Sequence, residues 1–113
     1  MLPRVHRLRR SSDFRRVYNR SLALSSSSLV FRVHRRSPKV SSRIGIVISA
    51  KISKKATVRN RLRRRLREAL RAQLRGLPNG LDIIVTARPG SIGKSYANLN
   101  HQCVTIIRQL KDG

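Results

Sequence analysis

The chain has 113 residues, with 27 Lys and Arg against four Asp and Glu, which gives a formal net charge of +23 at pH 7. A chain of this length folds as one domain with a modest core, which leaves no room for a large enzyme cleft. Because so positive a field attracts polyanions, nucleic acid is the expected partner. The domain is expected to span residues 1–113 and to begin with a basic arm, residues 1–10.

Membrane and secreted classes fit the composition poorly. There is no apolar run of 18 residues, and the basic start "MLPRVHRLRR" lacks the apolar segment of a secretory signal. A helix that binds a membrane surface would carry bulky aromatic residues, whereas this chain has no Trp and two Phe. The single cysteine, Cys103, cannot form an internal disulfide and is expected to be a core residue. We therefore expect a cytoplasmic protein without a membrane partner.

The first predicted element is a short helix over "SSDFRRVYNR". Ser11 or Ser12 could cap it, and Asp13 would lie near its positive end. The segment "LALSSSS" that follows is predicted to be a polar loop.

Two strands are predicted next, over residues 28–36 and 43–50. "SLVFRVHRR" alternates apolar and polar residues, and "RIGIVISA" has isoleucine at every second position. Ser37 and Pro38 mark a turn between them, so the two strands are expected to pair as a hairpin. The predicted core-facing residues are Leu29, Phe31, Val33, Ile44, Ile46 and Ile48.

The second half begins with a basic loop, "KISKKA", and a long helix that Gly76, Pro78 and Gly80 end. "LDIIVTA" (81–87) is predicted to be a buried strand, and residues 95–111 a last helix. The apolar stripes of the two helices are Val58, Leu62, Leu66, Ala69, Leu70 and Leu74, then Leu99, Cys103, Ile106, Ile107 and Leu110. The fold class is therefore α+β, a single-domain α-β-β-α-β-α sandwich with helices packed on a small sheet.

The long helix carries seven arginines and one acid, Glu68, in "ATVRNRLRRRLREALR" (56–71). Like charges at helical spacing repel, and a solvated helix face normally mixes signs, so an anionic partner is expected. Arg59, Arg63 and Arg65 border the apolar stripe, and the stem of Arg65 is expected to lie along it. Opposite the stripe lie Asn60, Arg61, Arg64, Arg67 and Arg71, here called the arginine face. Guanidinium groups bind phosphate oxygens in pairs, whereas the Asn60 amide could bond a base edge or a 2′-hydroxyl, or orient its arginine neighbours.

Aromatic side chains suggest a second surface. Phe14 and Tyr18 share one face of the first helix with Val17, and bases of single-stranded RNA stack on such rings. The alternative for each ring is core packing, which the alternating pattern around Phe31 favours for that residue.

The chain offers little for catalysis. The acids Asp13, Glu68, Asp82 and Asp112 are dispersed in the sequence, and His6, His34 and His101 have no partner at ligand spacing. "RPGSIG" lacks the Lys-Ser/Thr ending of a phosphate-binding loop. We therefore expect no catalytic residue and no metal ligand in the polypeptide itself.

These segments resemble a known family, the protein component of bacterial ribonuclease P. "RIGIVISAK" followed by "ATVRNRLRRRLREALR" matches its Arg-Asn-Arg motif, here Arg59-Asn60-Arg61, which continues with Arg63, Arg64 and Arg67. "RLRRSSDFRRVY" and "GLDIIVTARPG" are similar to its first helix and third strand, so nearly the whole chain is covered.

The resemblance implies a function and its partners. The RNA subunit would be the catalyst, and the holoenzyme would remove the 5′ leader of precursor tRNA by metal-assisted hydrolysis, with Mg²⁺ bound mainly through the RNA. Catalytic RNA and precursor tRNA would be the partners, without an obligate protein partner. The implied contacts with catalytic RNA are Lys51, Arg59, Asn60, Arg61, Arg64 and Arg67, and those with the single-stranded leader are Phe14, Tyr18 and Arg32.

Some features depart from the family or leave alternatives. Arg32 replaces an aromatic residue of some members, and Ala50 replaces a common second lysine. The family also implies a left-handed β-α-β crossover, opposite to the general rule. The fold resembles ribosomal domains, so a structural RNA-binding protein of ribosomal type is the alternative function. A free-standing nuclease or a DNA-packaging protein fits less well, because the acids are dispersed and the long helix lacks the short partner helix of a helix-turn-helix.

Overall fold

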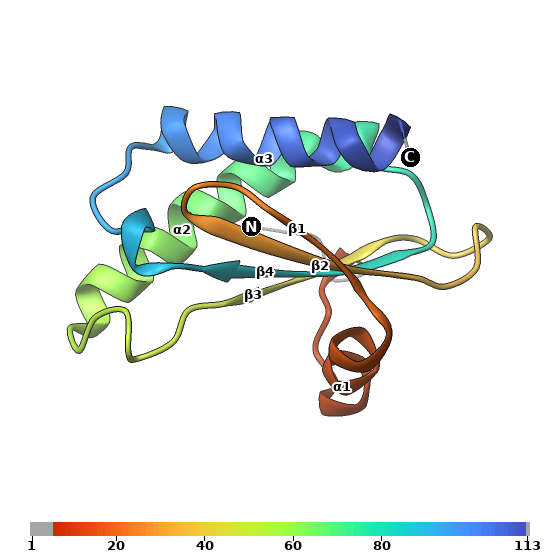
Figure 1. The fold of residues 1–113 in the computed structure, drawn as a ribbon, viewed down its shortest axis with the longest axis horizontal. Coiled ribbons are helices and arrows are strands. Elements are labelled where there is room, and N and C mark those ends of the chain that lie inside the picture. The colour runs from red at the N-terminus through yellow and green to blue at the C-terminus, as the bar shows by residue number, and fades with distance from the viewer. Residues whose placement is uncertain (1–5, 113) are drawn as a thin grey trace.

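The structure, a computed structural model, describes residues 6–112. The first five residues of the expected arm and the side chain of Asp112 lie outside the described part. The elements are α1 (Ser11–Arg20), β1 (Leu22–Ser25), β2 (Leu29–Arg35), β3 (Arg43–Val47), α2 (Ala56–Gln73), η2 (Leu74–Gly76), β4 (Leu81–Ala87), η3 (Pro89–Ser91) and α3 (Tyr96–Asp112). The predicted sandwich of helices on a small sheet is confirmed, with one strand more than expected (Figure 1).

The additional strand is β1, which the sequence had indicated as loop. It pairs antiparallel with β2, in a register that places Leu22 opposite Val33 and Ser25 opposite Val30. Only Leu24 of this strand is half-buried, and the turn closes where the Ser26 N–H donates to the Leu29 carbonyl at 2.9 Å. The serine-rich composition of this segment is typical of a loop, so it did not predict a strand. Strand β1 is stabilised by its pairing with β2 rather than by its own burial.

The predicted hairpin of residues 28–36 and 43–50 is wrong. The sheet order is β1-β2-β4-β3, so β4 lies between the two strands, antiparallel to β2 and parallel to β3. All residues of β4 except Thr86 are buried. A strand that is apolar on both faces is most stable at the centre of a sheet, where both faces are covered. The burial of β4 therefore outweighs the tendency of β2 and β3, which are consecutive in the sequence, to pair with each other.

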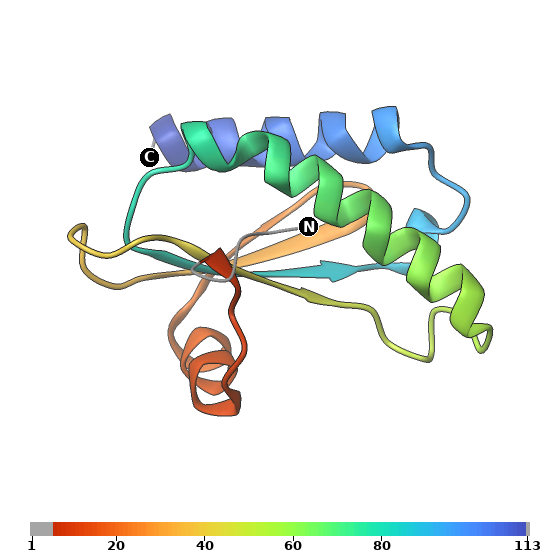
Figure 2. The ribbon, with the colours of Figure 1, turned by 180° about the vertical axis from the view of Figure 1, so that it is seen from behind.

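The β3–α2–β4 connection joins two adjacent parallel strands. Figures 1 and 2 together show that α2 lies above the sheet, on the side of β3. An observer who looks along the direction of the two strands sees the chain pass anticlockwise from β3 through α2 to β4. The crossover is therefore left-handed, as the resemblance implied and against the general preference for right-handed connections.

The main core lies between the sheet and the layer of α2 and α3. Phe31, Leu66 and Leu99 are completely buried there, as is Cys103. Burial raises the pKa of the Cys103 thiol to about 12, so this residue is an unreactive core side chain, as expected. Within residues 6–112, no helix has the combination of length and apolarity that crossing a membrane requires.

Helix α1 lies alone on the opposite face of the sheet (Figure 2). Its core is small: Val17 packs with Leu8 and Ile84, and Phe14 lies against them. Gly45 is needed for this approach, because a Cβ atom there would lie 2.6 Å from Cζ of Phe14. The expected serine cap is absent: the residue at the cap position is Arg10, which makes no side-chain cap bond.

Candidate RNA-binding surfaces

The exposed side of α2 carries most of the arginine face. Asn60, Arg61, Arg64 and Arg71 are exposed, while Leu62, Leu66, Ala69 and Leu70 are buried against the sheet and α3. Arg67 differs from the prediction, since it is half-buried. Its side chain lies near Arg7 and the edge of β3 rather than in open solvent.

Several polar groups of α2 are held by neighbours. Arg59 Nη1 donates to the carbonyl oxygen of Ser53 at 2.7 Å, and Arg65 Nη1 donates to that of Lys94 at 2.7 Å. The Asn60 Oδ1 atom accepts a bond from Arg63 Nη1 at 3.2 Å, so in this structure the amide orients an arginine. Arg59 thereby ties the loop before α2 to the helix, and Arg65 ties the loop before α3 to it.

Lys51 lies apart from α2, exposed in the loop that precedes the helix. Its backbone N–H donates to Ser49 Oγ at 3.1 Å, which shapes the turn.

Phe14, Tyr18 and Arg32 come together on the other face of the sheet. The guanidinium of Arg32 lies over the Tyr18 ring, 5.6 Å from its centroid, and Tyr18 is 46% exposed. This is a cation–π contact between α1 and β2. Phe14 is half-buried against Gly45, and Phe31 is fully buried in the main core on the opposite face. Phe14, Tyr18 and Arg32 are here called the aromatic surface. Tyr18 is its exposed member, and Arg32 is half-buried like Phe14.

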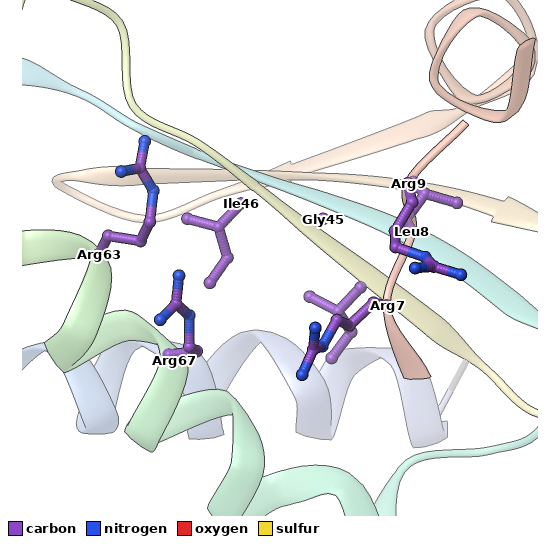
Figure 3. Close-up of a pocket in the computed structure, with 8 residues that line it drawn as sticks. Arg7, Leu8, Arg9, Gly45, Ile46, Arg63 and Arg67 are labelled. Carbon is purple, nitrogen blue, oxygen red and sulfur yellow. The ribbon is translucent and has the colours of Figure 1, made fainter. Parts of the chain in front are cut away.

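A cleft between the basic arm and α2 was not foreseen. It is lined by Arg7, Leu8, Arg9, Ile44, Gly45, Ile46, Arg63 and Arg67. Figure 3 shows Arg63 and Arg67 on one side of Ile46 and the arm on the other. The basic run "RVHRLRR" was the only signal in the sequence, and it could not show that the arm lies beside the helix.

The acids are less dispersed than the sequence suggested. Arg43 joins two of them: its Nη1 donates to Asp13 Oδ2 at 3.2 Å, and its Nη2 and Nε donate to Asp82 at 2.7 and 2.9 Å. The hydrogen bond to Asp82 raises the pKa of the Arg43 guanidinium, although partial burial lowers it. Arg36 Nε also pairs with Asp82 Oδ1 at 2.7 Å.

These carboxylates do not suit Mg²⁺. Asp82 is fully buried between the guanidinium groups of Arg36 and Arg43, and Asp13 also pairs with Arg43. A metal ion could bind these carboxylates only by displacing the arginines. In the described part of the chain, no three His, Cys, Asp or Glu side chains lie close enough to hold a metal ion.

The fold and these surfaces define a class, the small and strongly basic α+β proteins that bind RNA. Comparison with known sequences then gives the family: the model of the ribonuclease P family matches residues 2–111. Over 106 residues the chain is 34% identical to the ribonuclease P protein component of Clostridium kluyveri, which covers 93% of this chain and 94% of that relative. The chain belongs to the ribonuclease P protein family, the protein components of a ribonuclease that processes tRNA.

Solved structures agree with the fold. The ribonuclease P protein of Thermotoga maritima superposes with a TM-score of 0.81 at 27% identity, covering 91% of this chain and 96% of that one. A mutant of the Staphylococcus aureus protein gives a TM-score of 0.84 at 23% identity, with 94% and 88% coverage. The family resemblance and the α+β fold are confirmed.

Proposed function

We propose that this chain is the protein subunit of a ribonuclease P holoenzyme that removes the 5′ leader of precursor tRNA. The aromatic surface would hold the single-stranded leader. The residues that would bind the catalytic RNA are Lys51, Arg59, Asn60, Arg61, Arg64 and Arg67. The observation that carries this proposal is the one-sided arginine helix in a chain that the family covers almost completely.

In this proposal the polypeptide binds and positions, and the RNA catalyses. Mg²⁺ would be held mainly by the RNA subunit, because the buried carboxylates of the protein, Asp13 and Asp82, already form ion pairs with arginines. We expect the complex to work in the cytoplasm and to need no other protein.

The direct test combines the purified protein with a bacterial ribonuclease P RNA, Mg²⁺ and precursor tRNA. The protein alone should leave the substrate intact, and at low salt it should stimulate cleavage by the RNA. Cleavage by RNA-free protein would contradict the proposed division of labour. Tight binding to ribosomal RNA without stimulation would favour the ribosomal-type alternative.

Arg64→Ala should weaken binding to ribonuclease P RNA without unfolding the protein, because Arg64 is exposed on α2. Each lost phosphate contact lowers the slope of log affinity against log salt by about 0.7–0.9. Arg108→Ala, an exposed arginine of α3, removes the same charge away from this surface and is the control. Equal slopes for the two variants would mean that Arg64 is merely solvated.

Tyr18→Ala should weaken precursor tRNA binding by the holoenzyme by about 1–3 kcal/mol, the contribution of one stacked base. Mature tRNA has no leader, so its affinity should stay the same. Arg32 already lies over the Tyr18 ring, so a leader base would extend this stack. The measurement is the ratio of the two affinities.

Tyr96→Ala is the matched control for this experiment. Tyr96 is also exposed, at 42%, but it begins α3 on the far side of the sheet. If the Tyr18→Ala protein is folded and assembled and its affinity ratio equals that of the wild type, Tyr18 does not contact the leader. Phe14→Ala is a less clean test, because Phe14 also packs on Gly45.

A further inference from the structure

Helix α1 is attached to the sheet by few buried side chains. Val17 is its one buried apolar residue, and its other buried residue is a carboxylate, Asp13, which is 7% exposed. Phe14 is half-buried, and the rest of the helix is exposed. A segment with so few buried apolar contacts is easily displaced. The contacts of Asp13 therefore matter for how α1 lies on the sheet.

Asp13 reaches the sheet through Arg43, the first residue of β3. Arg43 Nη1 donates to Asp13 Oδ2 at 3.2 Å, while Nη2 and Nε donate to the two oxygens of Asp82 at 2.7 and 2.9 Å. The other ion pair of Asp13 within residues 6–112 is with Arg16 of the same helix, at 3.8 Å. Because Asp82 is buried in the central strand and holds the planar guanidinium by two bonds, Arg43 presents its remaining edge to α1 in a fixed direction.

The ion pair and the small core hold α1 at two points. Asp13 and Val17 are four residues apart, about one helical turn, so both contacts lie on the same side of the helix. Two contacts one turn apart oppose rotation of the helix about its axis. That rotation decides whether the Tyr18 ring meets Arg32, whose guanidinium now lies 5.6 Å from the ring centroid.

We infer that Arg43 is a positioning residue for leader binding: by holding Asp13, it fixes α1 so that the aromatic surface can receive the leader. The inference rests on the proposed function, since it takes the leader as the ligand of this surface. Arg43 acts here through α1 and not by touching RNA, because its guanidinium is already engaged by two carboxylates.

Asp13→Asn is the first test, because it removes the tie to α1 and leaves the bonds between Arg43 and Asp82. In the holoenzyme, the ratio of precursor tRNA affinity to mature tRNA affinity should fall about fivefold or more, the low end of the effect of one lost stacked base. The variant also loses a negative charge, which by itself would strengthen binding to an anionic leader. A lower ratio therefore reports geometry, and a wild-type ratio in the folded, assembled variant would overturn the inference.

Glu68→Gln is the matched control, since it removes the same charge from an exposed ion pair on α2. Its ratio should equal that of the wild type. Urea unfolding is measured on the same variants, because an ion pair that only stabilises the fold would change the unfolding midpoint of Asp13→Asn and leave the ratio of the folded protein unchanged.

Arg43→Lys is an independent test. Lysine has a single ammonium group in place of the planar fork, so it can bond to Asp82 but cannot hold Asp13 as well. The ratio should fall as it does for Asp13→Asn, and the double variant should lose no more than the larger single loss. Losses that multiply in the double variant would show that the two residues act separately and would overturn the inference.

A measurement without RNA follows the orientation of α1. A proton above an aromatic ring is shielded, so the NMR signals of the Arg32 guanidinium report its contact with Tyr18. Asp13→Asn and Arg43→Lys should move these signals toward their positions in Tyr18→Ala, and Glu68→Gln should not.

The inference and the proposed function fail separately. If Asp13→Asn changes neither the Arg32 signals nor the ratio, while Tyr18→Ala lowers the ratio, the positioning role is overturned and the proposed function stands. If the Arg32 signals move but neither variant changes the ratio, the hold of Arg43 on α1 is confirmed and the leader site of the proposed function is contradicted.

Discussion

Asp82→Asn is expected to lower the free energy of unfolding by about 3 kcal/mol, near the lower end of the roughly 3–5 kcal/mol range for a buried ion pair that loses one partner. The Asp82 carboxylate is fully buried and pairs with Arg36 and Arg43, each at 2.7 Å. The amide would remove the carboxylate that the two guanidinium groups share and would leave Arg43 with Asp13 as its counter-charge. The side chains of Arg36 and Arg43 are 19% and 23% exposed, so water relieves part of the cost.

Urea unfolding of the variant measures this loss, and Glu68→Gln is the control. Glu68 Oε2 lies 3.7 Å from Arg71 on the surface, with both side chains more than half exposed, so its replacement should cost at most about 1 kcal/mol. Similar losses in the two variants would show that Asp82 contributes no more than a surface pair. The Asp82 network matters for function, because Arg43 also bonds Asp13 and so ties α1 to the sheet.

Leu66→Ala should cost about 2–5 kcal/mol of stability, because it leaves a cavity under the middle of α2. Leu66 is completely buried between the helix layer and the sheet. Where the variant remains folded, its RNA affinity should keep the wild-type salt slope, since the arginine face points the other way.

Leu22→Ala is the matched control for the cavity. Leu22 is 65% exposed on the edge strand β1, so its truncation should change stability by no more than about 0.5 kcal/mol. Equal losses for the two leucines would contradict the burial that places the arginine face outward.

The sequence by itself determined the elements whose periodicity is strong. The strand at 81–87 has its predicted bounds, and the last helix, predicted over residues 95–111, lies one residue later at each end. The long helix ends before Gly76, as expected. The leucine stripe of α2 placed Arg61 and Arg64 outward, because a helix fixes the direction of each side chain from its spacing alone. The family also followed from local order, in Arg59-Asn60-Arg61 after a strand and a basic loop.

Only the tertiary structure decided which segments meet. The strand β1, the insertion of β4 between β2 and β3, and the pairing of Asp13 with Arg43 all depend on contacts between distant parts of the chain. The sequence predicted Arg67 in open solvent, whereas in the structure it lines the cleft between the arm and α2. The reason is the same, because the arm lies beside β3 only after the sheet has formed. The periodicity of a sequence shows on which side of its own helix or strand each residue lies. The order of strands in the sheet and the partners in ion pairs depend instead on how the whole core is buried.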